Sequence, residues 1–241
     1  MIAQTAPSPP VPPRGTPWRI DVPWPYLLAI LFAVLAIWLA APAVVSRFPA
    51  KIAHIANAAA ELAMLAMMLG ILRLAPPAGK LAPKLGIRRL RFADLGSVCA
   101  GLAAAYLWLL ATTPLWENLL RSRNIVWKPQ QELLTECASG SFGNYLALLA
   151  LAGVLIPTAE EILFRRVVFG ALFPVGRIAA TLLTAVVFAT AHLFLHGFPA
   201  LLGLGIVFQL QYLFTDNLLV PVLTHMIFNA VSLTLVFCMG Q

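Results

Sequence analysis

Two neighbouring carboxylates interrupt a long apolar part of the sequence. Glu160 and Glu161 follow an uncharged stretch, residues 141–159, and precede Arg165. Ionisable groups at membrane depth cost a few kcal/mol each and need a partner or a wet cavity. Residues four apart share one face of a helix, so the spacing predicts an ion pair between Glu161 and Arg165. Glu160 points about 100° away from that pair. It has no cation close in sequence and is therefore a candidate for chemistry.

Two histidines on later apolar segments are candidates to act with this carboxylate. His192 ends a Phe-x-x-x-His motif, and His225 begins a His-x-x-x-Asn motif that ends at Asn229. Glu160 and His192 both lie 16 positions from Gly176. If antiparallel helices meet at Gly176, the two side chains lie at one level, about 24 Å along the helix from the turn. The spacing therefore predicts that Glu160 and His192 meet, whereas another helix intervenes before His225.

These residue types suit a hydrolytic reaction. A glutamate with a histidine can hold and deprotonate water, and a second histidine with an asparagine amide can stabilise an oxyanion. Together they suggest cleavage of an amide or ester bond without a nucleophilic serine or cysteine. The alternative is one divalent metal such as zinc, for which Glu160, His192 and His225 would be three ligands. The sequence has no HExxH motif, and glutamate-activated water needs no metal, so we expect no cofactor.

The order of the motifs resembles a known family. The chain carries Glu-Glu-x-x-x-Arg, then Phe-x-x-x-His, then His-x-x-x-Asn, on successive apolar segments. This pattern is similar to the CAAX-processing and bacteriocin-processing (CPBP) family of intramembrane proteases. That family includes the Rce1-type prenyl-protein endopeptidases and bacterial members known as self-immunity proteins. The resemblance covers roughly residues 142–238, and residues 1–140 carry none of its motifs.

The resemblance implies a role for each motif residue. Glu160 would activate water with His192 as its partner, and His225 with Asn229 would stabilise the oxyanion. The family often has glycine after the motif arginine, where this sequence has Arg166. The remaining motif residues would support the site, two as a structural ion pair and one by packing beside the first histidine: Glu161, Arg165 and Phe188.

The composition indicates what kind of protein must position these residues. Hydrophobic residues make up 61% of the 241 residues, charged residues 10%, and the mean hydropathy is +0.89. Soluble domains are about half apolar and about a quarter charged. The sequence therefore predicts an all-α, polytopic membrane bundle. Its net charge of +7 lies in loops beside apolar segments, where lysine and arginine set topology and meet lipid headgroups. We expect the lipid bilayer, and no nucleic acid, as a partner.

The apolar segments predict about seven membrane helices, within a range of six to eight. Polar connectors separate them, of which residues 117–140 are expected to be a surface connector or an interfacial helix. The most basic connector lies between residues 73 and 91 and is expected to be cytoplasmic. Simple alternation from it places Gly176 on the cytoplasmic side and His192 towards the other side. The apolar segments are residues 22–46, 52–72, 95–116, 141–176, 178–215 and 217–241, the fifth with room for two helices.

Three regions and one main function follow. Residues 1–19 are expected to be a proline-rich disordered tail, residues 20–140 N-terminal membrane helices with the basic loop, and residues 141–241 a CPBP-like protease core. We expect an intramembrane endopeptidase of a bacterial inner membrane that acts on a membrane-associated protein or peptide. Two alternatives remain: a non-catalytic immunity or partner-binding protein of similar fold, and a proton-coupled carrier with Glu160 and the histidines as a relay. Transporters often contain internal repeats, and none is evident in the sequence.

Overall fold

The computed structural model describes residues 22–45, 47, 50–76, 80–125 and 142–239. Within these ranges the chain forms seven long helical rods and no strand. Five spans are long and apolar enough to cross a membrane, judged by length and composition. These observations confirm the predicted fold class, an all-α polytopic membrane bundle. The tail expected at residues 1–19 lies outside the described residues.

The helices fall close to the predicted segments. The structure has α1 (Trp24–Val45), α2 (Ala50–Leu74), a short α3 (Leu81–Lys84), α4 (Phe92–Ser122), a composite rod described below, α9 (Arg177–Ala191), α10 (Phe198–Thr215) and α11 (Leu219–Met239). The expectation for residues 95–116 was too short, because α4 continues through the first part of the predicted connector. Glu117 and Arg121 form an i,i+4 ion pair of 3.7 Å there, which supports a helical end that hydropathy alone does not detect.

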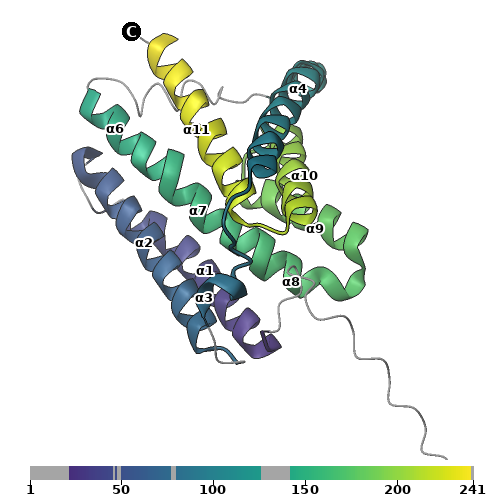
Figure 1. Cartoon of the computed structure of the whole chain (residues 1–241). Helices are drawn as coiled ribbons and strands as arrows, with labels where there is room; N and C mark the ends of the chain where they lie inside the picture. The colour runs from purple at the N-terminus through teal and green to yellow at the C-terminus, as the bar shows by residue number, and fades with distance from the viewer. Residues whose placement is uncertain (1–21, 46, 48–49, 77–79, 126–141, 240–241) are drawn as a thin grey trace, which may run out of the picture.

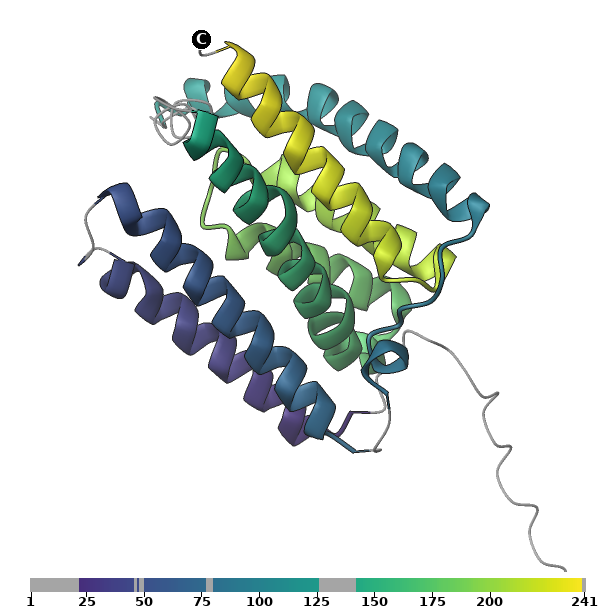
Figure 2. The ribbon, with the colours of Figure 1, turned by 60° about the vertical axis from the view of Figure 1, so that its left-hand side comes forward.

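The composite rod is the centre of the molecule. It consists of α6 (Phe142–Ala150), η1 (Leu151–Leu155), α7 (Ile156–Glu161), η2 (Ile162–Val168), α8 (Phe169–Leu172) and η3 (Phe173–Val175). We call this set the central rod. The pair α1–α2 lies along one side of it, and α4, α9, α10 and α11 lie on the other (Figures 1 and 2). Within the second group, α10 packs against both α9 and α4.

Two segments of the central rod, η1 and η2, are π-helical. Each places a backbone N–H on the carbonyl five residues earlier, as in the bond from Ile156 to Leu151. In this register the next carbonyl, that of Ala152, would be paired with Pro157, which has no N–H to donate. Its oxygen therefore needs another donor. Single π-helical turns are frequent at functional sites, and these two flank the short helix that ends in the paired carboxylates.

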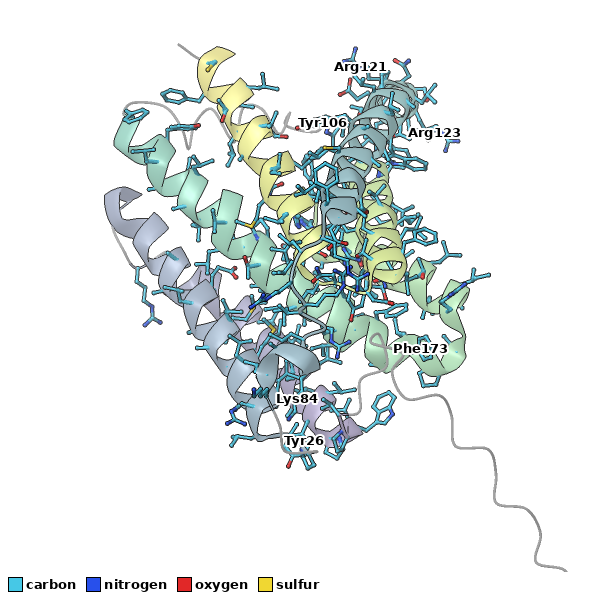
Figure 3. All side chains as sticks on the ribbon, in the orientation of Figure 1. Tyr26, Lys84, Tyr106, Arg121, Arg123 and Phe173 are labelled. Atoms are coloured by element: carbon cyan, nitrogen blue, oxygen red, sulfur yellow. The ribbon has the colours of Figure 1, made fainter. Side chains whose placement is uncertain are left out.

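The basic connector is bound into the protein at one end of the bundle. Lys84 donates from Nζ to the carbonyl of Leu72 at 3.0 Å, which satisfies the end of α2. Arg88 forms a two-pronged pair with Asp94 on α4, with both N–O distances 2.8 Å, and donates to the carbonyl of Thr215 at the end of α10. Figure 3 shows Lys84 at one end of the bundle and Arg121 at the other. Two of the cations expected to contact lipid therefore join the ends of three helices.

Candidate active site at the central rod

Glu160 lies between two histidines from different helices. Its Oε1 is 3.7 Å from Nε2 of His192, and its Oε2 is 3.8 Å from Nε2 of His225. The Glu160 side chain is 14% exposed, and that of His192 is 28% exposed. One carboxylate and two imidazole nitrogens thus converge at one partly exposed point.

The turn at Gly176 brings His192 to this position. Gly176 has φ of 101°, a conformation that glycine adopts far more readily than other residues. From there α9 returns along the central rod, and His192 follows its last residue. Nδ1 of His192 lies 2.8 Å from the carbonyl oxygen of Phe188. A carbonyl can only accept, so Nδ1 carries the hydrogen, and in the neutral ring Nε2 presents a lone pair towards Glu160. The equal spacing about Gly176 correctly predicted this meeting.

Phe188 packs beside both histidines. Its ring centroid lies 4.8 Å from that of His192 and 6.1 Å from that of His225. Phe208 on α10 stacks on the other histidine, with 4.7 Å between the centroids of Phe208 and His225. These rings limit the rotation of both imidazoles. The sequence suggested packing for Phe188, but it contained no signal for Phe208, which belongs to no motif.

His225 is held by the second carboxylate. Its Nδ1 lies 3.1 Å from Oε1 of Glu161 and donates to it, so that Nε2 faces Glu160. The neighbouring carboxylates therefore have different contacts: Glu160 faces both Nε2 atoms, and Glu161 fixes one ring. The sequence predicted the pair of Glu161 with Arg165 and did not identify His225 as a further partner.

Glu161 and Arg165 form a completely buried ion pair. The distance from Arg165 Nε to Glu161 Oε2 is 2.7 Å, and both side chains are 0% exposed. Arg165 also donates to the carbonyl of Gly205 on α10 at 3.1 Å. A Cβ on Gly205 would lie 3.0 Å from the Cα of Ala185, so glycine permits the close approach of α9 and α10. Buried pairs persist when additional hydrogen bonds satisfy their remaining atoms, as happens here.

Asn229 lies one turn after His225 and contacts the central rod. Its Nδ2 donates to the carbonyl of Ala152 at 2.8 Å. This is the carbonyl that Pro157 leaves without a donor in the π-helical register. An amide has two hydrogens, so one remains for another acceptor. Of the four residues expected at the site, three therefore surround one point, and the fourth fastens α11 beside it.

A third carboxylate approaches from the N-terminal half. Glu61 lies on α2, which contacts α7 and η1, and its charge is close enough to interact with that of Glu160. Its Oε2 is buried and has no hydrogen-bond partner among the described residues. Glu61 is the only acidic residue between residues 22 and 93, which is the one signal that could have singled it out.

The geometry also bears on the metal alternative. Among the residues that the structure describes, no group of three or more histidine, cysteine, aspartate or glutamate side chains is arranged to hold a metal ion. Glu160, His192 and His225, the three ligands considered from the sequence, are included in that set.

Comparison with known proteins finds similarity in the segment that contains these residues. The family model of the type II CAAX prenyl endopeptidase Rce1-like proteins matches residues 142–231. The membrane-embedded CAAX protease MroQ of Staphylococcus aureus (strain USA300) is 37% identical over 83 residues, 32% of this chain and 34% of that protein. The putative membrane peptidase YdiL of Bacillus subtilis (strain 168) is 29% identical over 83 residues, 34% of each.

The extent of these matches is limited. The chain spans about a third of the length of the curated relatives it matches, and no solved structure matches it. The matched range nevertheless contains all three motifs and every residue placed around Glu160 except Glu61. Residues 142–231 therefore belong to the Rce1-like family, the family that the motifs of the sequence resemble.

Proposed function

We propose that this protein is an intramembrane endopeptidase that hydrolyses a peptide bond of a membrane-associated protein or peptide. The observation that carries the proposal is the approach of two Nε2 atoms to one carboxylate, at 3.7 and 3.8 Å. These distances are too long for direct hydrogen bonds. The facing atoms therefore keep hydrogen-bonding capacity for a reacting water molecule and a peptide carbonyl.

In the first step the carboxylate of Glu160 acts as a general base. It takes one proton from water while Nε2 of His192 accepts the second hydrogen as a hydrogen bond. The water oxygen forms a bond to the peptide carbonyl carbon, and the carbonyl π electrons move to its oxygen. When the carbon–nitrogen bond then breaks, the leaving amine takes the proton from Glu160. The carboxylate is restored, and no covalent enzyme intermediate forms.

The negative charge on the carbonyl oxygen needs donors during this step. We assign this role to His225 and Asn229, which lie on one face of α11. Glu161 accepts from Nδ1 of His225, so Nε2 faces the site and donates there when the ring is the imidazolium, which carries a hydrogen on both nitrogens. The second N–H of Asn229 is the other donor. Donors of this kind stabilise a tetrahedral intermediate because they are fixed before the charge develops.

The fold favours access from the side of the basic loop. Arg166 lies six residues after Glu160 and donates to the backbone carbonyl of Lys84 in that loop. His225 lies six residues after Leu219, where α11 begins. Six residues correspond to about 9 Å of helix. By the positive-inside rule the basic loop is cytoplasmic, so the substrate would enter from the cytoplasmic leaflet. The two bacterial relatives favour a bacterial inner membrane as the location.

The test is a comparison of membrane proteomes from cells that contain the wild type, Glu160→Gln or no protein. We expect at least one new peptide terminus in the wild-type membranes that is missing from the other two. Glutamine keeps size and hydrogen bonding but removes the base. If Glu160→Gln supports every biological effect of the wild type, the protein acts as a non-catalytic binder or immunity factor. Proton uptake coupled to a solute, without any new terminus, would identify a carrier.

A further inference from the structure

The segment after His192 is irregular backbone at membrane depth. α9 begins at the charged residue Arg177 and has 15 residues, so it is about 22 Å long. The hydrocarbon core of a bilayer is about 30 Å thick. α9 is therefore too short to cross the hydrocarbon core by itself, and the backbone becomes irregular at His192. Irregular backbone at this depth is tolerated only where protein or a water-filled cavity satisfies its polar groups.

Helix α4 supplies these partners. Nε1 of Trp116 donates to the carbonyl of Leu195 at 2.9 Å, and Oε1 of Glu117 lies 3.1 Å from Nε2 of His196. These two neighbouring residues of α4 thus hold two neighbouring residues of the loop. α4 lies beside α10 (Figure 1).

A third contact continues the attachment into α10. Nε1 of Trp108 donates to the carbonyl of Pro199 at 2.8 Å. A Cβ on Gly203 would collide with the Trp108 indole, so the ring lies directly on the α10 backbone. α4 therefore holds the loop between His192 and α10 at two points and the first turn of α10 at a third.

The loop in turn determines where His192 lies. His192 is tied to α9 through its ring nitrogen, which bonds to the carbonyl of Phe188, and through its backbone N–H, which bonds to the carbonyl of Thr190. The next residue, Leu193, has φ of 50°. This left-handed backbone is sparsely populated by leucine and persists only where its surroundings impose it. The contacts that impose this backbone conformation are those with α4. His192 is the residue at which the helix gives way to the loop. A loop that loses its contacts with α4 would therefore change the distance from His192 to Glu160.

We infer that Trp116 and Glu117 are positioning residues that hold His192 towards Glu160. Both lie outside the range matched by the family and belong to no motif. The expected effect on catalysis rests on the proposed function, whereas the expected effect on the position of His192 does not. Catalytic groups displaced by about 1 Å can lose about 100-fold in rate, so small losses of contact at α4 are amplified at the site.

The first experiment measures His192 directly. The chain has four histidines, so the ring signals of protein labelled with 13C-histidine can be assigned by single substitutions. Trp116→Phe removes one donor and keeps the aromatic ring, and Trp24→Phe on α1 is the matched control. We expect the His192 signal to shift or broaden in Trp116→Phe and Glu117→Ala, and to stay unchanged in Trp24→Phe. An unchanged His192 signal in both α4 variants would overturn the inference.

The second experiment measures cleavage of the terminus found by the proteome comparison, per folded molecule. We expect Trp116→Phe and Glu117→Ala to lower kcat about tenfold or more with KM within about twofold, since only the water-activating geometry changes. Glu117→Gln keeps an acceptor for His196 and should retain at least half of the wild-type kcat. Unchanged kcat in both α4 variants would overturn the positioning role, even if thermal stability falls. If the wild type cuts nothing, the proposed function fails, and the His192 signal alone decides the inference.

Discussion

The two adjacent carboxylates of the central rod, Glu160 and Glu161, differ in their exposure and in the length of their contacts. Glu161 is 0% exposed and bonds Arg165 at 2.7 Å and His225 at 3.1 Å. Glu160 is 14% exposed, and its carboxylate oxygens lie 3.7 and 3.8 Å from Nε2 of His192 and Nε2 of His225. The difference suggests a structural role for Glu161 and leaves Glu160 available for the proposed chemistry. The short bonds of Glu161 use its hydrogen-bonding capacity to hold helices together, whereas Glu160 makes no such short bond and, in the function we propose, faces the substrate.

The sharpest test of this difference is Glu160→Gln. We expect cleavage to fall by about 10²–10⁴-fold, because that is the usual contribution of a general base. Membrane insertion and thermal unfolding should match the wild type, since Glu160 makes no short bond to a cation. The measurement is the cleavage rate together with the unfolding temperature in the same detergent. A variant that cleaves at the wild-type rate would remove Glu160 from the mechanism.

Asn229→Ala extends the test to the oxyanion. We expect turnover to fall by about 10²–10³-fold, as for other oxyanion donors, with little change in substrate binding. The lost bond to Ala152 adds a destabilisation of about 1 kcal/mol. Ser232→Ala is the control, because Ser232 lies on the same helix and donates only to the carbonyl of Phe228. Equal kcat values for the two variants would contradict the oxyanion role.

Glu161→Gln tests the structural role of Glu161 in its buried ion pair. Removing one charge of a buried pair costs about 3–5 kcal/mol, because it leaves Arg165 buried without its counter-charge. We expect a lower unfolding temperature and a lower folded yield. The fractional loss of folded yield should be at least as large as any fractional loss of activity per folded molecule. Normal stability combined with abolished turnover would instead show that Glu161 takes part in the chemistry, and the contrast between the two carboxylates would be wrong.

The smallest expected effect is that of metal removal. A strong chelator should leave the cleavage rate of the wild type unchanged, because in the proposed mechanism Glu160 and His192 activate water without a metal. The rate is measured before and after chelation and again after zinc is added. Activity that is abolished by chelation and restored by zinc would replace the glutamate mechanism with one in which Glu160, His192 and His225 are ligands.

The sequence by itself determined the features that depend on composition and short spacing. Its apolar excess led to the correct fold class, since so few polar side chains cannot cover a water-soluble surface. The four-residue spacing predicted the Glu161–Arg165 pair, because helix geometry fixes which side chains are neighbours. The equal offsets about Gly176 predicted that Glu160 meets His192. The last two follow from backbone geometry within one helix or one hairpin.

Only the tertiary structure decided the contacts that depend on several helices at once. His225 meets Glu161 across 64 residues of sequence, Asn229 meets Ala152 across 77, and His196 meets Glu117 across 79. No local spacing encodes these distances, because each depends on the crossing of helices that lie between the partners. The π-helical register could not be predicted from the sequence either. Pro157 marks a missing donor in the sequence, but which carbonyl it leaves free, and that Asn229 fills it, depends on where α11 packs against the rod.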